Sequence, residues 1–206
     1  MNNHFNKYIA EFFGTFGLTL AIMLSFAASK PLATPFVAAL TLGLFVYTLG
    51  PISGAHLNPA VTIGLLSIKK ISSREAVKYI VAQFIGALLV FIIVRFTTHL
   101  PTVPQEVNSI AVVAAELLGA FFFTFGIAAV VYEKVPASLS GVVISGSLLL
   151  GIFMATGVSS AVLNPAVAVG INSLTPEYVL APIIGAILGM WAFTLIAKED
   201  VYKKLH

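Results

Sequence analysis

Long apolar runs alternate with short polar segments along this chain. Each run is roughly 20 residues long, which as an α-helix crosses the ~30 Å hydrocarbon core of a bilayer. Prolines in the segments between the runs mark helix ends. The runs lie near residues 8–29, 34–51, 75–97, 109–132, 136–157 and 177–197. This pattern predicts an all-α membrane protein with six transmembrane helices.

Two apolar stretches contain the same polar step, Leu-Asn-Pro-Ala-Val. One is SGAHLNPAVTIG from Ser53, and the other is SSAVLNPAVAVG from Ser159. The apolar residues that follow, 60–68 and 166–174, would form helices of about 14 Å, half the thickness of the hydrocarbon core. Such re-entrant half-helices are tolerated where they are buried in protein or line a water-filled cavity.

The residue types of this step suit the start of a helix and the lining of a pore. Asn is a strong N-cap, and Pro fits the first helical position. We expect the side-chain oxygens of Asn58 and Asn164 to cap the half-helices. Their NH₂ groups would then remain free as donors.

The two halves of the chain resemble each other. AEFFGTF from Ala10 matches AELLGAF from Ala115, and QFIGALL from Gln83 matches PIIGAIL from Pro182. Because each half has three spans, an odd number, the second half must enter the membrane from the opposite side. The sequence thus predicts an inverted repeat, approximately 1–100 and 105–206, with the half-helix N-termini meeting near the midplane. There, two amides and two positive dipole ends would bind the oxygen of water and repel cations.

The repeat also bears on the first run, which follows Lys7 and ends in small residues, as a signal peptide does. We expect it to be a retained span, because it is long enough to cross and its motif recurs at Ala115.

Charged residues are few and clustered. They make up 9% of the chain, against about 25% in a soluble domain. If the N-terminus is cytoplasmic, nine of the 11 lysines and arginines fall on the inside and two, Lys30 and Arg95, on the outside. The inside group is Lys7, Lys69, Lys70, Arg74, Lys78, Lys134, Lys198, Lys203 and Lys204. We therefore expect both termini to be cytoplasmic, in the plasma or inner membrane, and we read the clusters as topology rather than as nucleic-acid binding.

The residue types that usually carry catalysis are scarce. The chain has no cysteine and four histidines, of which His4, His99 and His206 lie near predicted segment ends. We find no nucleophile paired with a base, no metal-ligand spacing and no cofactor motif. We therefore expect neither an enzyme nor a metal or cofactor site.

These motifs together resemble those of the aquaporin, or major intrinsic protein, family, and the resemblance covers nearly the whole chain. It implies a single transmembrane channel domain over residues 1–206. The implied fold is a right-handed bundle of six helices plus two half-helices, with a pore in each protomer of a homotetramer. The implied pore midplane consists of the two Asn-Pro-Ala motifs: Asn58, Pro59, Ala60, Asn164, Pro165 and Ala166.

Three further polar residues are placed by the same resemblance. Glu11 and Glu116 lie inside predicted spans, and an intramembrane carboxylate is a candidate functional site. The family uses equivalent glutamates to hold the re-entrant loops, which we favour over a proton relay, because buried carboxylates need partners. We expect His56 to pack in its loop rather than to act as a pH gate, although histidine can titrate in the physiological range.

The chain departs from the family at the selectivity filter. The second motif usually continues with arginine, but here that position is Val167, and the Asp that often follows in glycerol-conducting members is Ala168. The other filter positions carry over as Ala38, Ile152 and Ala161. These four apolar residues predict a filter that is wide and binds water poorly.

The sequence therefore predicts a passive channel for water or small uncharged solutes in a lipid bilayer. One alternative is a facilitator of glycerol, urea, hydrogen peroxide, ammonia or a gas, with little water selectivity. A second is an ion-coupled secondary transporter, since those also use inverted repeats with broken helices. A third is a non-conducting structural membrane protein on the same scaffold.

Overall fold

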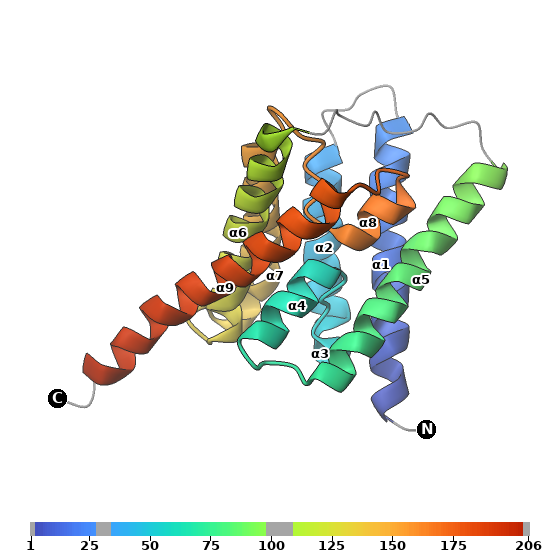
Figure 1. The fold of residues 1–206 in the computed structure, drawn as a ribbon. Coiled ribbons are helices and arrows are strands. Elements are labelled where there is room, and N and C mark those ends of the chain that lie inside the picture. The colour runs from blue at the N-terminus through green and yellow to red at the C-terminus, as the bar shows by residue number, and fades with distance from the viewer. Residues whose placement is uncertain (1–2, 28–33, 98–108, 204–206) are drawn as a thin grey trace.

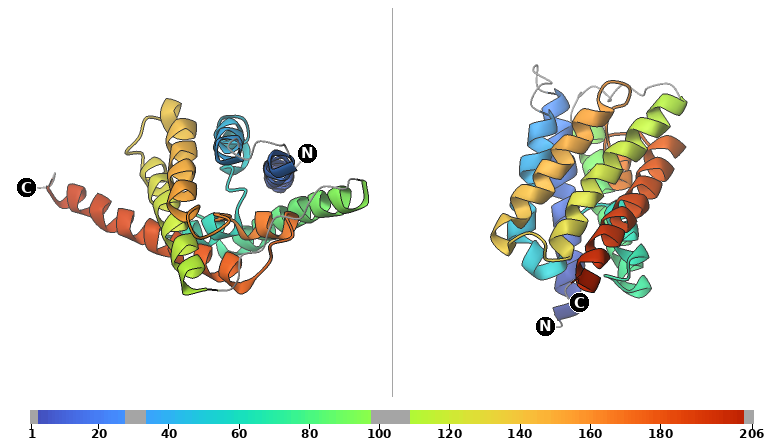
Figure 2. Two further views of the ribbon diagram at one scale, coloured as in Figure 1. Left: turned by 90° about the horizontal axis from the view of Figure 1, so that it is seen from above. Right: turned by 90° about the vertical axis from the view of Figure 1, so that its left-hand side faces the viewer.

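The computed structural model describes residues 3–27, 34–97 and 109–203, and these form helices joined by short connections (Figure 1). The long helices tilt across one another, as the two further views show (Figure 2). Helix α1 packs on α5, α6 packs on α9, and α2 packs on α7. The elements in chain order are α1 (Asn3–Ala27), α2 (Thr34–Thr48), α3 (Gly50–Ser53), α4 (Pro59–Ser67), α5 (Ser73–Thr97), α6 (Ile110–Val131), η2 (Ala137–Leu139), α7 (Ser140–Ala155), α8 (Pro165–Gly170) and α9 (Pro176–Lys203).

Five of the six predicted spans are long and apolar enough to cross a membrane: Phe5–Phe26, Ser73–Phe96, Ile110–Val131, Ala137–Ala155 and Pro176–Ala197. The sixth prediction, 34–51, is an apolar helix of 15 residues, α2, followed by the one-turn α3. The helix is interrupted at this point because Pro51 has no N–H to donate to the preceding turn. At 1.5 Å per residue α2 alone measures only about 22 Å, so its span was predicted too long.

Glycines let the helix backbones approach closely, and they do so at matching places in the two halves. A Cβ added to Gly86 of α5 would lie 2.5 Å from the carbonyl oxygen of Phe12 in α1. A Cβ on Gly185 of α9 would lie 2.2 Å from the carbonyl oxygen of Leu117 in α6. Gly189 makes the same approach to Phe121. The Gly185 and Gly189 spacing therefore serves packing inside one protomer.

The two half-helices differ in length. Helix α4 has nine residues, as predicted, but α8 ends at Gly170 after six, so the expected extent to residue 174 was wrong. Asn172 takes a left-handed conformation (φ 60°), and the next N–H, of Ser173, donates to the carbonyl of Ala168 at 2.8 Å. This is a Schellman cap, which ends a helix whatever the hydropathy of the residues beyond it.

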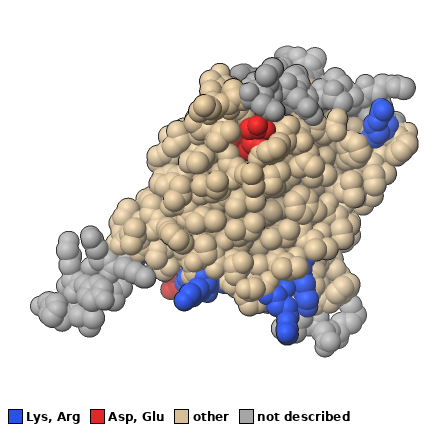
Figure 3. Space-filling model, viewed as in Figure 1, with Lys and Arg blue, Asp and Glu red and all other residues tan. Residues whose placement is uncertain are grey.

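Basic residues gather at one end of the bundle. Figure 3 shows lysine and arginine side chains along the lower edge of the molecule, where both termini lie in Figure 1. Arg95 is in the last turn of α5, at the opposite end. Lys30 and Lys204 lie outside the described residues, and so do the side chains of Lys198 and Lys203.

Candidate pore and its supporting network

The two asparagines cap the half-helices, as predicted. Asn58 is extended (φ −159°, ψ 121°), and its Oδ1 accepts a hydrogen bond from the N–H of Ala60 at 2.8 Å. The Oδ1 of Asn164 accepts from Ala166 at 3.0 Å and from Val167 at 3.3 Å. Each cap satisfies N–H groups at a helix start that is buried inside the protein.

The asparagines also tie the two re-entrant loops together. Asn58 Nδ2 donates to the carbonyl of Leu163 at 2.9 Å, and Asn164 Nδ2 donates to the carbonyl of Leu57 at 2.9 Å. The expectation that both NH₂ groups remain free was therefore wrong for one N–H of each. Because an amide has two such hydrogens, each asparagine keeps a second N–H for other partners.

A buried glutamate holds the first loop. The carboxylate of Glu11, which is fully buried, accepts four hydrogen bonds. Its Oε1 accepts from Ser53 Oγ at 2.7 Å and from the His56 N–H at 3.0 Å. Its Oε2 accepts from the Leu57 N–H and from Gln83 Nε2, both at 2.8 Å. Two of these donors are backbone groups of a loop that has no ladder or helix to satisfy them.

A second glutamate repeats the arrangement in the other half. Glu116 is also fully buried. It accepts hydrogen bonds from Ser159 Oγ, from the N–H of Val162 at 3.0 Å and from the N–H of Leu163 at 2.8 Å. In the second half, Pro182 occupies the position that corresponds to Gln83, so that position has no side-chain donor for Glu116.

The loops need these anchors because their backbones are strained. Ala55, Leu57, Ala161 and Leu163 all have φ between 48° and 52°. The left-handed conformation costs a residue with a Cβ about 1–2 kcal/mol. The matching serines help, since Ser53 Oγ and Ser159 Oγ each also accept the N–H two residues on, at 3.0 Å. The strained turns aim the carbonyls of Leu57 and Leu163 at the asparagines of the opposite loop.

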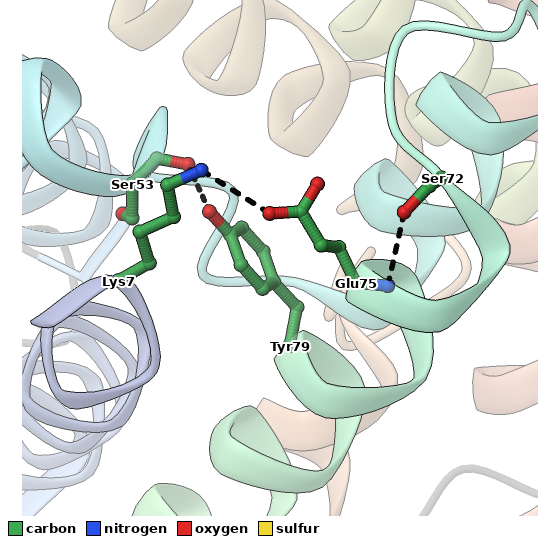
Figure 4. Close-up of polar contacts among 5 residues, drawn as sticks. All are labelled: Lys7, Ser53, Ser72, Glu75 and Tyr79. Atoms are coloured by element: carbon green, nitrogen blue, oxygen red, sulfur yellow. Dashed lines mark hydrogen bonds and ion pairs between the residues drawn. The ribbon is translucent and has the colours of Figure 1, made fainter. Parts of the chain in front are cut away.

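A tyrosine fastens the start of the first loop to α5. Figure 4 shows Tyr79, whose hydroxyl donates to the carbonyl of Ser53 at 2.7 Å. Beside it, Lys7 and Glu75 form an ion pair at 3.1 Å. Both ionic side chains are about one-third exposed, so the pair contributes no more than about 1 kcal/mol. In the same view Ser72 Oγ accepts the N–H of Glu75, at the start of α5.

His56 is packed in this network. Its Nδ1 lies 3.2 Å from Thr62 Oγ1, and its ring meets that of Tyr79 edge-on at 5.0 Å between centroids. Thr62 Oγ1 already donates to the carbonyl of Asn58 and accepts from Gln83 Nε2, both at 3.0 Å. Because the Thr62 hydroxyl hydrogen is already donated, this oxygen can only accept from His56, so we assign the ring proton to Nδ1 of His56. The Nε2 atom is then an acceptor in the neutral ring.

Cavities open toward both ends of the bundle. One, of about 290 Å³, is bordered by Asn58 and Asn164 and extends to Phe26 and Thr34 at the ends of α1 and α2. The other, of about 450 Å³, is bordered by His56 and lies at the opposite ends of α2 and α6. The re-entrant loops thus lie between two openings.

All four predicted filter positions border the 290 Å³ cavity: Ala38, Ile152, Ala161 and Val167. Each is less than 9% exposed, and none carries a side-chain donor. Thr156, Ser159 and Ser160 add polar groups to this wall, and none of the three was predicted as a filter residue from the sequence.

Several supporting residues were also missed from the sequence. Gln83 and Tyr79 act on the loop from α5, and the carbonyls of Leu57 and Leu163 belong to apolar residues. One signal was available, because a serine stands five residues before each asparagine, as Ser53 and Ser159. Such a matched pair of hydroxyls indicates a shared structural role.

Comparisons with known proteins identify the family of the chain. The sequence model of the family described as "Major intrinsic protein" matches residues 1–193. Aquaporin NIP1-1 of Zea mays is 33% identical over 212 residues, which cover 92% of this chain and 74% of that protein. Probable aquaporin AqpM of Archaeoglobus fulgidus is 33% identical over 233 residues, covering 93% and 94% respectively.

A solved structure supports the fold independently. The X-ray structure of the aquaglyceroporin from Plasmodium falciparum superposes with a TM-score of 0.70, over 94% of this chain and 95% of that one. At 23% identity it is evidence of a shared fold. With the family match over residues 1–193, these findings show that the chain belongs to the major intrinsic protein family.

Proposed function

We propose that the protein is a passive membrane channel for water and small uncharged solutes, as its family is a family of channels. The observation that carries the proposal is the pair of cross-bonded asparagines between two cavities. Each asparagine presents an N–H at the start of a half-helix, where the helix dipole is positive. A solute with an oxygen acceptor is stabilised there, and a cation is repelled.

The filter positions define the solute class. Ala38, Ile152, Ala161 and Val167 border the first cavity, and none of these four filter residues brings a guanidinium or an aromatic ring to its wall. Such a wall replaces few hydrogen bonds of a water molecule that leaves bulk solvent, but it has room for a neutral solute with an apolar surface. We therefore propose that solutes larger than water, of the size of urea or glycerol, pass relatively well.

Ion-coupled transport fits the contacts less well. The mid-span carboxylates Glu11 and Glu116 are fully buried and accept hydrogen bonds from loop backbone. A proton or sodium ion bound there would displace the donors that hold the loops. We propose that both glutamates are scaffold residues, and that His56 has a packing role beside them.

The remaining expectations are part of the same proposal. We propose one channel domain over residues 1–206, built of repeats at about 1–100 and 105–206, assembled as a homotetramer in the plasma or inner membrane. Lys69, Lys70 and Arg74, between the end of α4 and the first turn of α5, would lie on the cytoplasmic side together with both termini.

The filter is tested by restoring the arginine. In proteoliposomes followed by stopped-flow light scattering, Val167→Arg is expected to lower urea and glycerol permeability by about tenfold, corresponding to about 1.4 kcal/mol of added barrier. Val167→Leu is the control, because it adds bulk without charge or donors, and it should lower permeability less. Equal permeabilities of wild type and Val167→Arg would refute the assignment of the filter.

A further inference from the structure

A third cavity lies outside the pore, on the side of the bundle where α4 meets α9. It measures about 430 Å³ and is bordered by Ser67, Lys69, Tyr132, Trp191 and Leu195, among others. Lys69 lies two residues beyond the end of α4, and Tyr132 directly follows the candidate span Ile110–Val131. The cavity is therefore placed near the level of one membrane–water boundary.

The upper wall of this cavity continues into an apolar stripe on α9. Ile184, Leu188, Trp191 and Leu195 recur at helical spacing on one face, and each is 43–70% exposed. The Trp191 ring is held in place, because its Nε1 donates to Ser67 Oγ at 3.1 Å. An exposed apolar stripe that includes a tryptophan is suited to an acyl chain.

The polar end of the cavity carries positive charge. Lys69 is exposed, and the described part of the chain gives its ammonium group no hydrogen-bond or ion-pair partner. Lys70, the next residue, does not border this cavity, but its Nζ lies 4.5 Å from the centroid of the Tyr132 ring, which does. The described residues that border the cavity include no carboxylate. The ligand that fits this cavity has an anionic headgroup joined to an apolar chain.

The backbone at Lys69 determines which substitutions can test the role of its charge. Lys69 has a φ of 61°, in the left-handed region, where it occupies the position after the cap of α4. The matching position after α8 is Asn172, with a φ of 60°. Asparagine and glycine tolerate this conformation best. A lysine at this place makes the turn less stable than asparagine or glycine would, and its exposed side chain puts an ammonium group at the cavity.

We propose that this cavity, bordered by Lys69, Tyr132 and Trp191, binds one anionic phospholipid of the surrounding bilayer. Its phosphate lies against the ammonium of Lys69, and an acyl chain lies along the α9 stripe. Basic pockets at the ends of transmembrane helices are suited to such headgroups. Charge complementarity and continuity with the lipid-facing stripe favour a lipid over a soluble anion.

The chain contains a built-in reporter, since Trp191 is its single tryptophan. The protein is reconstituted in mixtures of dioleoylphosphatidylcholine and dioleoylphosphatidylglycerol, with bromine on the acyl chains of one lipid at a time. Bromine quenches nearby tryptophan fluorescence, so the quenching curves give the relative affinity of the two lipids at this site. Wild-type protein should prefer phosphatidylglycerol.

Lys69→Asn should weaken this preference by about fivefold, which corresponds to about 1 kcal/mol for one lysine near a membrane surface. The substitution copies Asn172 and keeps the left-handed turn; Lys69→Gly is a second variant with the same backbone tolerance. Lys78→Gln is the matched control, because Lys78 is an exposed lysine near the start of α5, with its Nζ 5.2 Å from the ring centroid of Tyr8. It should leave the preference unchanged.

Three results would overturn the proposal. The first is equal quenching by both brominated lipids in the wild type. The second is an equal loss of preference in the Lys69 variants and in Lys78→Gln, which would indicate general surface charge. The third is abolition of the preference by inorganic phosphate at constant ionic strength, which would identify a site for soluble anions.

Discussion

Replacement of Glu11 by glutamine separates a scaffold from a proton carrier. In the best orientation, the new amide oxygen accepts from Leu57 N–H and Gln83 Nε2, and the new NH₂ faces Ser53 Oγ and the N–H of His56. The serine hydroxyl can rotate to accept, but the His56 N–H loses its partner.

The magnitude follows from these contacts. An unpaired buried N–H costs about 1–3 kcal/mol, and each hydrogen bond that changes from charged to neutral loses about 1 kcal/mol. Glu11→Gln should therefore lower the free energy of unfolding by about 3–5 kcal/mol. Glu116→Gln should give a loss of the same order, because Glu116 accepts two backbone N–H groups in the same way.

The assay is reversible unfolding in mixed micelles, with flux measured in parallel. Glu75→Gln is the control, since its ion pair with Lys7 is about one-third exposed and should contribute less than about 1 kcal/mol. The scaffold account predicts that Glu11→Gln is far less stable than Glu75→Gln. If the two variants unfold alike, and Glu11→Gln instead removes a pH-dependent component of flux, the carboxylate is a proton carrier.

Two further changes test the packing and the midplane. Gly185→Ala should destabilise the protein by about 1–3 kcal/mol, because the added Cβ would meet the backbone of Leu117. Gly146→Ala in α7 should stabilise it by about 0.5–1 kcal/mol, because Gly146 has open space around it. Thermal unfolding in detergent compares the two variants. Asn58→Asp keeps the helix cap, but the new side chain cannot donate to the carbonyl of Leu163 and it adds negative charge. Cation leakage, measured in a vesicle potential assay, should therefore rise. Unchanged ion exclusion would argue against the midplane assignment.

Much of the architecture can be predicted from the sequence because it rests on local signals. Hydropathy over about 20 residues identifies a span, and the step at Asn58 and Asn164 carries cap and first-turn residues together. The inverted repeat follows from counting spans between motifs. The same local signals predicted too great a length for α8, although Asn172 was an available stop signal. The apolar residues beyond it, up to Leu174, favoured a longer helix.

The network between the loops could not be read in this way. The acceptors of the asparagine N–H groups are carbonyls of Leu57 and Leu163, and a carbonyl has no signature in the residue type. These contacts depend on left-handed turns that sequence propensity disfavours for leucine. The turns exist because Glu11 and Glu116, about fifty positions earlier in the chain, hold the N–H groups that they expose.

Solute flux through the wild-type protein in proteoliposomes, followed by stopped-flow light scattering with water, urea and glycerol gradients in each direction, decides whether the protein is a passive channel. A passive channel gives flux that depends only on the solute gradient and is the same with and without a pH or sodium gradient. Flux that requires either ion gradient would contradict this function, as would vesicles whose response equals that of protein-free liposomes although the reconstituted protein is folded.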